Sequence, residues 1–376
     1  MKVMTVVGTR PELIRLARVI AKLETACDHV LVHTGQNYDP LLNEIFLTEL
    51  EIKTPDVQFT PERTSLGSFV GSLLHNVELA IHEHRPDALL VLGDTNSCLA
   101  AYMARRLGVT VFHMEAGNRC WDLNVPEETN RRVVDHVSDF NLVYTEHARQ
   151  NLLREGLHPR KIYLTGSPMR EVLDHYERQI SSSDVLTRLQ LTAGGYFLAS
   201  VHREESVDRP EILAQLVAAF EDLSVEYGLP VLVSTHPRTR KQLALAGITT
   251  SDRLTFAPPF GFFDYNALQQ SAKCVISDSG TISEESIMLG FAAVSPRNAI
   301  ERPEALDAGA TILCGTTSAG IVGAVRRAIV TRTTDVAPSV PPEYAVPNTS
   351  ERVVRLILGL TNLRGRWDGI GPDQSA

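Results

Sequence analysis

Short runs of apolar residues rich in Val, Ile and Leu recur along the chain, and most are followed by a longer amphipathic stretch. This alternation is typical of buried parallel strands separated by helices. The first half of the chain predicts strands at Val3–Val7, His29–His33, Ala88–Leu92, Thr110–Met114, Asn141–Tyr144 and Lys161–Thr165. The second half predicts a similar series at Tyr196–Val201, Pro230–Ser234, Leu254–Phe256, Cys274–Ser277, Ala292–Ser295 and Thr311–Leu313.

The strand rhythm stops within residues 168–191, where a serine-rich polar cluster is of the kind found between domains. We therefore expect an α/β protein with two doubly wound, Rossmann-like domains that face a cleft, residues 1–172 and 173–349. A further helix is predicted within residues 350–364 and is expected to pack back on the first domain. Ligands of such folds bind at the carboxyl ends of the strands, so functional residues are sought there.

The composition is that of an ordinary globular protein: 376 residues, of which 43% are hydrophobic and 22% charged, with a formal net charge of −9. This balance disfavours a nucleic-acid partner but allows an anionic ligand held by a few basic side chains. The five scattered cysteines have no metal-ligand spacing, which indicates a reducing compartment and no metal site. Because no cleavable leader or membrane-spanning run is evident, we expect a cytoplasmic protein without a membrane partner.

The glycine signatures of common nucleotide-dependent enzymes are missing from the chain. Neither G-x-G-x-x-G nor G-x-x-x-x-G-K-[ST] occurs, which disfavours a bound dinucleotide and a P-loop. The hydrolase signature G-x-S-x-G is missing as well. We therefore expect chemistry that needs no redox cofactor.

Two acidic residues follow consecutive predicted strands, at the edge where ligands are expected. Asp94 comes shortly after the third predicted strand, and Glu115 directly follows the fourth. Neighbouring carboxylates repel one another, which raises at least one pKa and can leave one group as an acid and the other as a base. The alternative is structural: Asp94 would cap a helix that begins near Asn96, and Glu115 would pair with Arg119. The position of both acids at adjacent strand ends favours catalysis.

The segment Gly8–Glu12 follows the first predicted strand and opens a helix. Its free backbone N–H groups, the positive end of the helix and the side chain of Arg10 together suit an anionic group. The alternative is a capped turn with a surface arginine.

A second acidic and basic segment begins at Pro126, where a helix start is predicted because acids suit the first helical turn. Glu127 and Arg131 are its candidate functional residues. The alternative is a solvated helix end in which Glu128 pairs with Arg132.

His202 and Arg203 follow the first predicted strand of the second half, in the position that Thr9 and Arg10 have in the first. A histidine there can protonate or hydrogen-bond a departing phosphate oxygen, and the arginine adds charge. Alternatively, the histidine merely forms a hydrogen bond with a carbonyl group.

Arg302 lies in a later loop of the second half. Its side chain either faces the cleft or anchors the turn.

The segment Ser277–Glu285 is the clearest signal, because a strand runs into a small-residue turn that starts a helix. Free N–H groups and the helix dipole would meet a phosphate there. A capping box between Thr281 and Glu284 is compatible with this reading. Glu285, one turn into the helix, could accept hydrogen bonds from ribose hydroxyls. The small residues of the turn are Ser279, Gly280 and Thr281.

Together these motifs resemble those of the non-hydrolysing UDP-N-acetylglucosamine 2-epimerases. The resemblance runs from residue 1 to near Leu360 and implies the two-domain glycosyltransferase-B fold. The matching segments, in the order of the family, are Gly8–Glu12, Gly93–Thr95, His113–Gly117, Pro126–Arg131, His202–Arg203, Asp278–Glu285 and Glu301–Glu304.

The resemblance implies inversion at C-2 of a UDP-linked 2-acetamido sugar, by default UDP-GlcNAc to UDP-ManNAc. UDP would be eliminated to give a 2-acetamidoglucal and then added back, without a cofactor, and the enzyme would be a homodimer. The implied catalytic residues are Asp94, Glu115 and Glu127 near the sugar and His202 at the diphosphate. The implied substrate contacts are Arg10, Arg15, Arg131, Arg203, Ser279, Gly280, Thr281, Glu285 and Arg302.

The chain departs from the family pattern at three places. Arg15 stands where many members have lysine, Thr281 replaces a usual glycine, and the loop Asn118–Val125 is shorter than in the familiar enzymes. These features resemble the sub-branch that converts UDP-2-acetamido-2,6-dideoxy-L-talose to UDP-N-acetyl-L-fucosamine, which is the alternative substrate. A glycosyltransferase of the same fold is the alternative of another class, and the clustering of acids argues against it.

Overall fold

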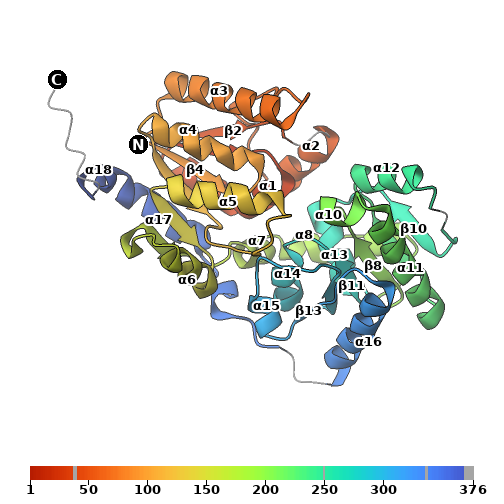
Figure 1. Ribbon diagram of the computed structural model, residues 1–376. Coiled ribbons are helices and arrows are strands. Elements are labelled where there is room, and N and C mark those ends of the chain that lie inside the picture. Colours follow the sequence, from red (N-terminus) through yellow and green to blue (C-terminus); the bar gives the residue numbers. More distant parts are fainter. Residues whose placement is uncertain (37–39, 249, 335–337, 368–376) are drawn as a thin grey trace. The chain divides into compact units, whose positions relative to one another are not determined.

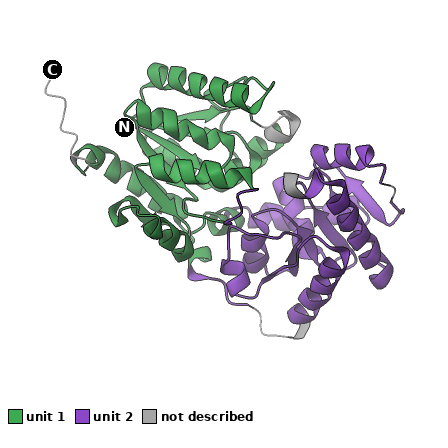
Figure 2. Cartoon of the chain, in the orientation of Figure 1, with its two compact units in different colours: residues 1–119, 125–174, 343–376 green, residues 120–124, 175–342 purple. Residues whose placement is uncertain are grey.

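The computed structural model describes residues 1–36, 40–248, 250–334 and 338–367, and these residues form two compact units (Figure 2). The chain enters unit 2 briefly within unit 1, returns, then builds the main part of unit 2 and returns to unit 1 again. Unit 1 comprises Met1–Arg119, Val125–Asp174 and Glu343–Ala376, and unit 2 comprises Cys120–Asn124 and His175–Pro342.

Unit 1 is built on a parallel sheet whose described strands run in the order β3-β2-β1-β4-β5-β6-β7. The chain starts in the middle of the sheet and winds outward in both directions, with helices between the strands (Figure 1). The strands are β1 Lys2–Val7, β2 Asp28–His33, β3 Val57–Gln58, β4 Ala88–Leu92, β5 Thr110–Met114, β6 Phe140–Val143 and β7 Ile162–Leu164. The helices are α1 Arg10–Ala26, α2 Pro40–Glu49, α3 Leu66–His84, α4 Ala100–Arg106, α5 Pro126–Val137, α6 Glu146–Arg154, α7 Met169–His175, α17 Thr349–Leu360 and α18 Arg364–Trp367, with short 3-10 turns η1 Asn96–Leu99, η2 Pro159–Lys161, η3 Pro342–Tyr344 and η4 Thr361–Leu363 near them.

Unit 2 is built on a second parallel sheet, whose described strands run in the order β10-β9-β8-β11-β12-β13. It is doubly wound like the first sheet, so the predicted α/β fold class is confirmed. The strands are β8 Phe197–Ser200, β9 Val231–Ser234, β10 Leu254–Ala257, β11 Val275–Ser277, β12 Ala293–Ser295 and β13 Thr311–Leu313. The helices are α8 Glu177–Ser181, α9 Val185–Arg188, α10 Glu204–Val207, α11 Pro210–Tyr227, α12 Pro237–Leu245, α13 Phe262–Ser271, α14 Ile282–Leu289, α15 Glu304–Asp307 and α16 Ser318–Thr334.

Every predicted strand is present, to within one residue at each end. The prediction missed β3, which pairs with the end of β2 through Val32 and Val57 and through His33 and Gln58. This strand lies at the edge of the sheet and is only two residues long. It therefore has no apolar run that a sequence pattern could reveal.

Each sheet is buried between helices. In unit 1, helices α3, α4 and α5 cover one face, where Leu73, Ala101 and Val134 pack on strand residues such as Val6 and Val91. Burial of a strand on both faces removes the polar alternation, which explains the continuous apolar runs of the sequence.

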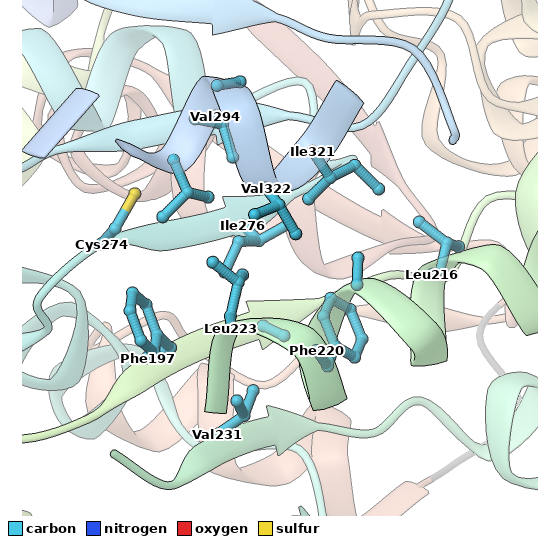
Figure 3. Close-up of a cluster of buried hydrophobic side chains, with 14 of the residues drawn as sticks. Phe197, Leu216, Phe220, Leu223, Val231, Cys274, Ile276, Val294, Ile321 and Val322 are labelled. Carbon is cyan, nitrogen blue, oxygen red and sulfur yellow. The ribbon is translucent and has the colours of Figure 1, made fainter. Parts of the chain in front are cut away.

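A matching layer in unit 2 joins α11 and α16 to one face of the sheet (Figure 3). Phe220 and Leu223 of α11 and Ile321 of α16 pack there with Ile276 and Val294 from the strands. These layers fix the strands rigidly, so the turns at their carboxyl ends are held in place.

Helix α17 packs against α1 within unit 1. Its apolar stripe includes Val353 and Ile357, both fully buried. The backbone N–H and the hydroxyl of Ser350 donate to the carboxylate of Glu171, with the N–H contact at 2.7 Å. The short 3-10 turn η3 precedes this helix.

Among the described residues, no helix has both the length and the apolar character needed to cross a membrane. The same residues contain no cluster of three or more His, Cys, Asp or Glu side chains that could hold a metal ion.

Candidate functional site

Three turns meet at the carboxyl edge of the sheet in unit 1, because β1, β4 and β5 are neighbours in it. They follow Val7, Leu92 and Met114, the last residues of these strands. The N–H of Gly93 donates to the carbonyl oxygen of Met114 at 3.0 Å, which ties two of the turns together. Asp94 and Glu115 therefore leave neighbouring strands at the same edge, as expected.

Glu115 forms a buried ion pair with Arg15 of α1. Only 3% of Arg15 and 5% of Glu115 is exposed to solvent, so neither charge is screened by water. The guanidinium carbon of Arg15 also lies 6.0 Å from the centre of the Tyr144 ring. The alternative in which Glu115 pairs with Arg119 is wrong.

The backbone of Glu115 is strained. Its φ angle is +64°, in the left-handed region that a residue with a side chain rarely adopts. This conformation costs about 1–2 kcal/mol relative to the right-handed one. Backbone strain of this kind concentrates at functional sites, where the surrounding structure maintains it.

Asp94 forms an ion pair with Arg131 of α5. Arg131 also donates to Glu128 at 3.0 Å, and the amide of Asn130 donates to the carbonyl oxygen of Asp94 at 3.1 Å. Asp94 does not cap the following turn, because Thr95 occupies that position and accepts from the N–H of Ser97. Each of the two strand-end acids thus forms an ion pair with its own arginine. From the sequence we expected two carboxylates that repel one another and did not predict these arginine partners.

Glu12, in the first turn of α1, is a buried acid that the sequence prediction did not include among the functional residues. It is 1% exposed, and its Oε2 accepts from the N–H groups of Gly8 at 2.5 Å and Thr9 at 3.0 Å. Its Oε1 accepts from the hydroxyl of Thr95, the neighbour of Asp94. Burial raises the pKa of Glu12 to about 7, against these hydrogen bonds, and the charge of Asp94 adds to the rise. The spacing of a threonine and a glutamate three residues later was the available signal.

The raised pKa of Glu12 predicts a pH-dependent contribution to stability. The folded state holds this proton more tightly than the unfolded state, where the pKa is 4.5, so the contribution is complete below pH 4.5 and is lost as the pH rises through 7. The loss amounts to roughly 3 kcal/mol. Urea unfolding of the wild type and of Glu12→Gln, compared between pH 4 and 8, measures it. A stability difference between the two proteins that does not change with pH would contradict this prediction.

The other candidates of unit 1 lie nearby in the fold. Arg10 begins α1, and its guanidinium carbon is 5.8 Å from the centre of the Phe46 ring. Glu127 lies in the first turn of α5, with its side chain partly exposed. The alternative pair of Glu128 with Arg132 is present at 3.0 Å, but Glu128 is fully buried rather than solvated.

Asp278 organises the corresponding edge of unit 2, although it was not among the predicted site residues. Its Oδ2 accepts from the backbone N–H groups of His202 at 2.9 Å and Arg203 at 3.0 Å, and its Oδ1 lies 3.1 Å from Nδ1 of His202. Burial opposes the charge on Asp278, but His202 and Arg203 lower its pKa. The carboxylate thereby holds two predicted site residues in one turn.

The turn before α14 is built from small residues. The hydroxyls of Ser279 and Thr281 lie 3.0 Å apart, and Arg302 donates to the carbonyl oxygen of Gly280. A Cβ atom on Gly280 would lie 2.6 Å from a terminal nitrogen of Arg302, so a larger residue there would displace the Arg302 side chain. Thr281 precedes the helix but its side chain does not cap it, so the predicted capping box with Glu284 is wrong.

Two buried acids border this turn. Glu285 is 5% exposed, and its Oε2 accepts from the amide of Gln269 at 2.8 Å. Glu301 accepts from Arg203 at 3.1 Å and from both terminal nitrogens of Arg297 at 2.8 Å. Arg203 is therefore held between Glu301 and the Asp278 turn. The sequence offered no signal for the role of Arg297, which depends on a contact between loops.

A family model described as UDP-N-acetylglucosamine 2-epimerase matches residues 21–358 of the chain. The chain belongs to the UDP-N-acetylglucosamine 2-epimerase family. Epimerases are isomerases, so the protein is an enzyme of that class.

Relatives within the epimerase family match nearly the whole chain. The UDP-N-acetylglucosamine 2-epimerase of Methanococcus maripaludis is 34% identical over 338 residues, which cover 87% of this chain and 91% of the relative. A UDP-2,3-diacetamido-2,3-dideoxy-D-glucuronate 2-epimerase of Pseudomonas aeruginosa is 32% identical over 335 residues, with 88% and 92% covered. Epimerases of this similarity thus include proteins named for different sugars.

Solved structures of epimerases also match. The UDP-N-acetylglucosamine 2-epimerase of Rickettsia bellii is 39% identical, with a TM-score of 0.90 over 97% of this chain and 98% of that one. The enzyme of Methanocaldococcus jannaschii, in complex with UDP-GlcNAc and UDP, is 31% identical, with a TM-score of 0.89 over 95% and 99%. The fold and the family therefore agree.

Proposed function

We propose that the protein inverts the configuration at C-2 of a UDP-linked 2-acetamido hexose. UDP-GlcNAc and UDP-ManNAc are the default pair. The C1–O bond breaks and UDP leaves, the proton at C-2 is removed in an anti elimination, and a 2-acetamidoglucal forms. UDP then adds back to C-1 while a proton is delivered to the opposite face of C-2.

The chemistry explains why acids and arginines are both needed. The C-2 hydrogen of a sugar is barely acidic, but its loss becomes easy once positive charge develops at the ring as UDP departs. The elimination therefore needs at least a base near C-2 and positively charged groups that bind the diphosphate. In this proposal Asp94, Glu115 and Glu127 supply the acid and base groups.

The nucleotide is assigned to the turns of unit 2. The small residues at the start of α14 offer N–H groups and the helix dipole to a phosphate, Arg203 and Arg302 supply positive charge, and Glu285 accepts from the ribose. His202 hydrogen-bonds or protonates the departing diphosphate oxygen. Arg10, Arg15 and Arg131 are proposed as further substrate contacts from unit 1.

The observation that carries the proposal is the pair of strand-end acids, each against its own arginine, in a chain of this family. One of these acids is buried and has strained backbone, as expected of a group held ready for chemistry. Because a glycosyltransferase needs only a nucleotide cradle and an acceptor site, this paired arrangement favours the epimerase.

The choice of substrate is part of the proposal. UDP-GlcNAc is favoured because the related structure from Methanocaldococcus jannaschii contains it. Conversion of UDP-2-acetamido-2,6-dideoxy-L-talose to UDP-N-acetyl-L-fucosamine is the second candidate, favoured by Arg15, Thr281 and the short loop at Asn118–Val125. Proton NMR of a panel of UDP-sugars identifies the pair that interconverts.

We also propose that the enzyme is a cytoplasmic homodimer that needs no cofactor.

The reaction is tested by incubating the enzyme with UDP-GlcNAc alone in deuterated water. An epimerase incorporates deuterium at C-2 without any acceptor, and UDP-ManNAc appears. A glycosyltransferase leaves C-2 unlabelled, and a hydrolysing epimerase releases free N-acetylmannosamine. If no UDP-sugar of the panel acquires deuterium at C-2, the proposal is wrong.

Replacing Glu285 with Ala is expected to weaken UDP binding while leaving the catalytic acids of unit 1 intact. Loss of charge-assisted hydrogen bonds to the ribose would raise the Kd for UDP roughly 10- to 100-fold. Isothermal titration calorimetry with UDP measures the change. Glu226→Ala is the matched control, because Glu226 forms a surface ion pair with Arg326 in the same unit. A normal UDP affinity for Glu285→Ala would exclude the ribose role.

A further inference from the structure

His113 is a buried residue that the proposed chemistry does not use. It lies on β5, two positions before Glu115, and is completely shielded from solvent. Its Nε2 lies 2.7 Å from the carbonyl oxygen of Gly93, the residue before Asp94. Its Nδ1 lies 2.9 Å from Oδ1 of Asp135 on α5. One ring therefore touches both the turn after β4 and a carboxylate of another element.

Both partners of the ring can only accept hydrogen bonds. A carbonyl oxygen has no hydrogen to donate, and neither has an ionised carboxylate. Burial opposes the charge on Asp135, but His113 and Arg119 lower its pKa, so Asp135 is the charged partner. Because the carbonyl oxygen of Gly93 can only accept, Nε2 of His113 carries the hydrogen and donates to it, while Nδ1 faces the carboxylate of Asp135 at 2.9 Å.

Asp135 extends the contact to the turn that carries Glu115. Its two carboxylate oxygens lie 3.2 and 3.3 Å from the N–H of Gly117, which donates to them. Gly117 has a φ of +80°, in the left-handed region that favours glycine. A Cβ atom at this position would lie 2.4 Å from the carbonyl oxygen of Ala148, because the turn packs closely against the backbone of α6. This close packing leaves the turn little room to shift. Arg119 donates to the same carboxylate at 2.7 Å and closes the network.

We propose that His113 is a positioning residue for the reaction, because its ring joins the turn of Asp94 to Asp135 and through it to the turn of Glu115. The Gly93 contact fixes the peptide that precedes Asp94, and Asp135 fixes the residue two positions after Glu115. Both acids are thereby held in register without contact between His113 and the substrate. This inference rests on the proposed function for its kinetic readout.

Two isosteric variants separate the two ring contacts. The amide nitrogen of glutamine can take the place of Nε2, and that of asparagine the place of Nδ1. We expect His113→Gln to keep the Gly93 contact and to retain kcat within about 5-fold, whereas His113→Asn loses that contact and about 50-fold in kcat. The KM and the Kd for UDP are expected to stay within about 2-fold in both variants, because the nucleotide is assigned to unit 2.

A second buried histidine of the same sheet is the control for a merely structural effect. His29 on β2 contacts Thr5 at 2.9 Å, away from the acidic turns, so His29→Gln should lower the thermal midpoint without changing kcat. If kcat falls equally in His113→Gln and His113→Asn, or in neither, the positioning role is wrong. If His113→Asn does not fold, His113→Gln decides alone, and a loss of more than about 10-fold in kcat at an unchanged thermal midpoint overturns the proposal.

Nitrogen-15 NMR of histidine-labelled wild-type protein tests the same network without any activity. A hydrogen on Nε2 of His113 is expected, because that nitrogen donates to the carbonyl oxygen of Gly93, and the signals are assigned by their loss in His113→Gln. An Nε2 without a hydrogen would overturn the proposal, because it could not donate to Gly93. Because wild-type deuterium exchange reports separately on the proposed function, failure of the reaction and failure of the network are distinguishable.

Discussion

Replacing Asp94 with Asn is expected to lower turnover at least about 100-fold while UDP affinity changes little. The amide has the shape of the carboxylate and can still accept a hydrogen bond from Arg131, the partner of Asp94. It cannot take up a proton, so the variant removes acid and base chemistry and leaves the turn in place. Steady-state kinetics with UDP-GlcNAc and calorimetry with UDP measure the two quantities.

Asp87→Asn is the matched control for this substitution. Asp87 directly precedes the same strand, β4, and accepts from the N–H of Lys2 at 2.7 Å. This contact lies at the amino ends of the strands, whereas Asp94 lies at their carboxyl ends. The control is expected to keep full turnover. Unchanged turnover in Asp94→Asn as well would remove Asp94 from the mechanism, and a parallel loss of UDP affinity would assign it to binding instead.

Replacing Arg15 with Met is expected to destabilise the protein by about 3–5 kcal/mol, because it removes the arginine that pairs with the buried charge of Glu115. Adding Glu115→Leu removes that charge, and two apolar side chains of similar size can restore most of the lost stability. The double variant should nevertheless stay inactive, since it lacks the acid. Chemical denaturation and the deuterium exchange assay separate the two effects.

Arg15→Lys is the conservative control for the ion pair. A lysine keeps the charge but has a single point of contact, so we expect the stability to lie between those of the wild type and Arg15→Met. Substantial activity in the double variant would show that Glu115 is structural, which would contradict its proposed role. Equal stability of Arg15→Met and the wild type would show that the pair contributes nothing to folding.

The sequence predicts the strands and the turns of this fold well, because both follow from local patterns. A strand buried on both faces is a continuous apolar run, and the polar residues after it mark the carboxyl edge of the sheet. Asp94, Glu115 and the small-residue turn before α14 were located in this way. The exception, β3, was too short and too near the sheet edge to have such a pattern.

The partners of the functional residues could not be predicted, because they come from distant parts of the chain. Arg119 is a neighbour of Glu115 in sequence, but the residue that pairs with Glu115 is Arg15, one hundred positions away. The importance of Asp278 likewise depends on how β11 lies beside β8. Glu12 is different: its capping pattern with Thr9 was visible, but its burial beneath the turn of Asp94 was not.

The return of the chain to unit 1 has a consequence for synthesis on the ribosome. Helix α1 precedes the main part of unit 2 in the sequence, yet the apolar stripe of α17 that covers it, with Val353 and Ile357, follows unit 2. The salt bridge of 2.7 Å between Lys22 and Glu351 joins the same two helices. During translation, the packing of unit 1 therefore stays incomplete, with part of α1 uncovered, until unit 2 and then α17 have been synthesised. A stop codon before Thr349 should yield a chain that chaperones retain, even though every residue assigned to the reaction is present.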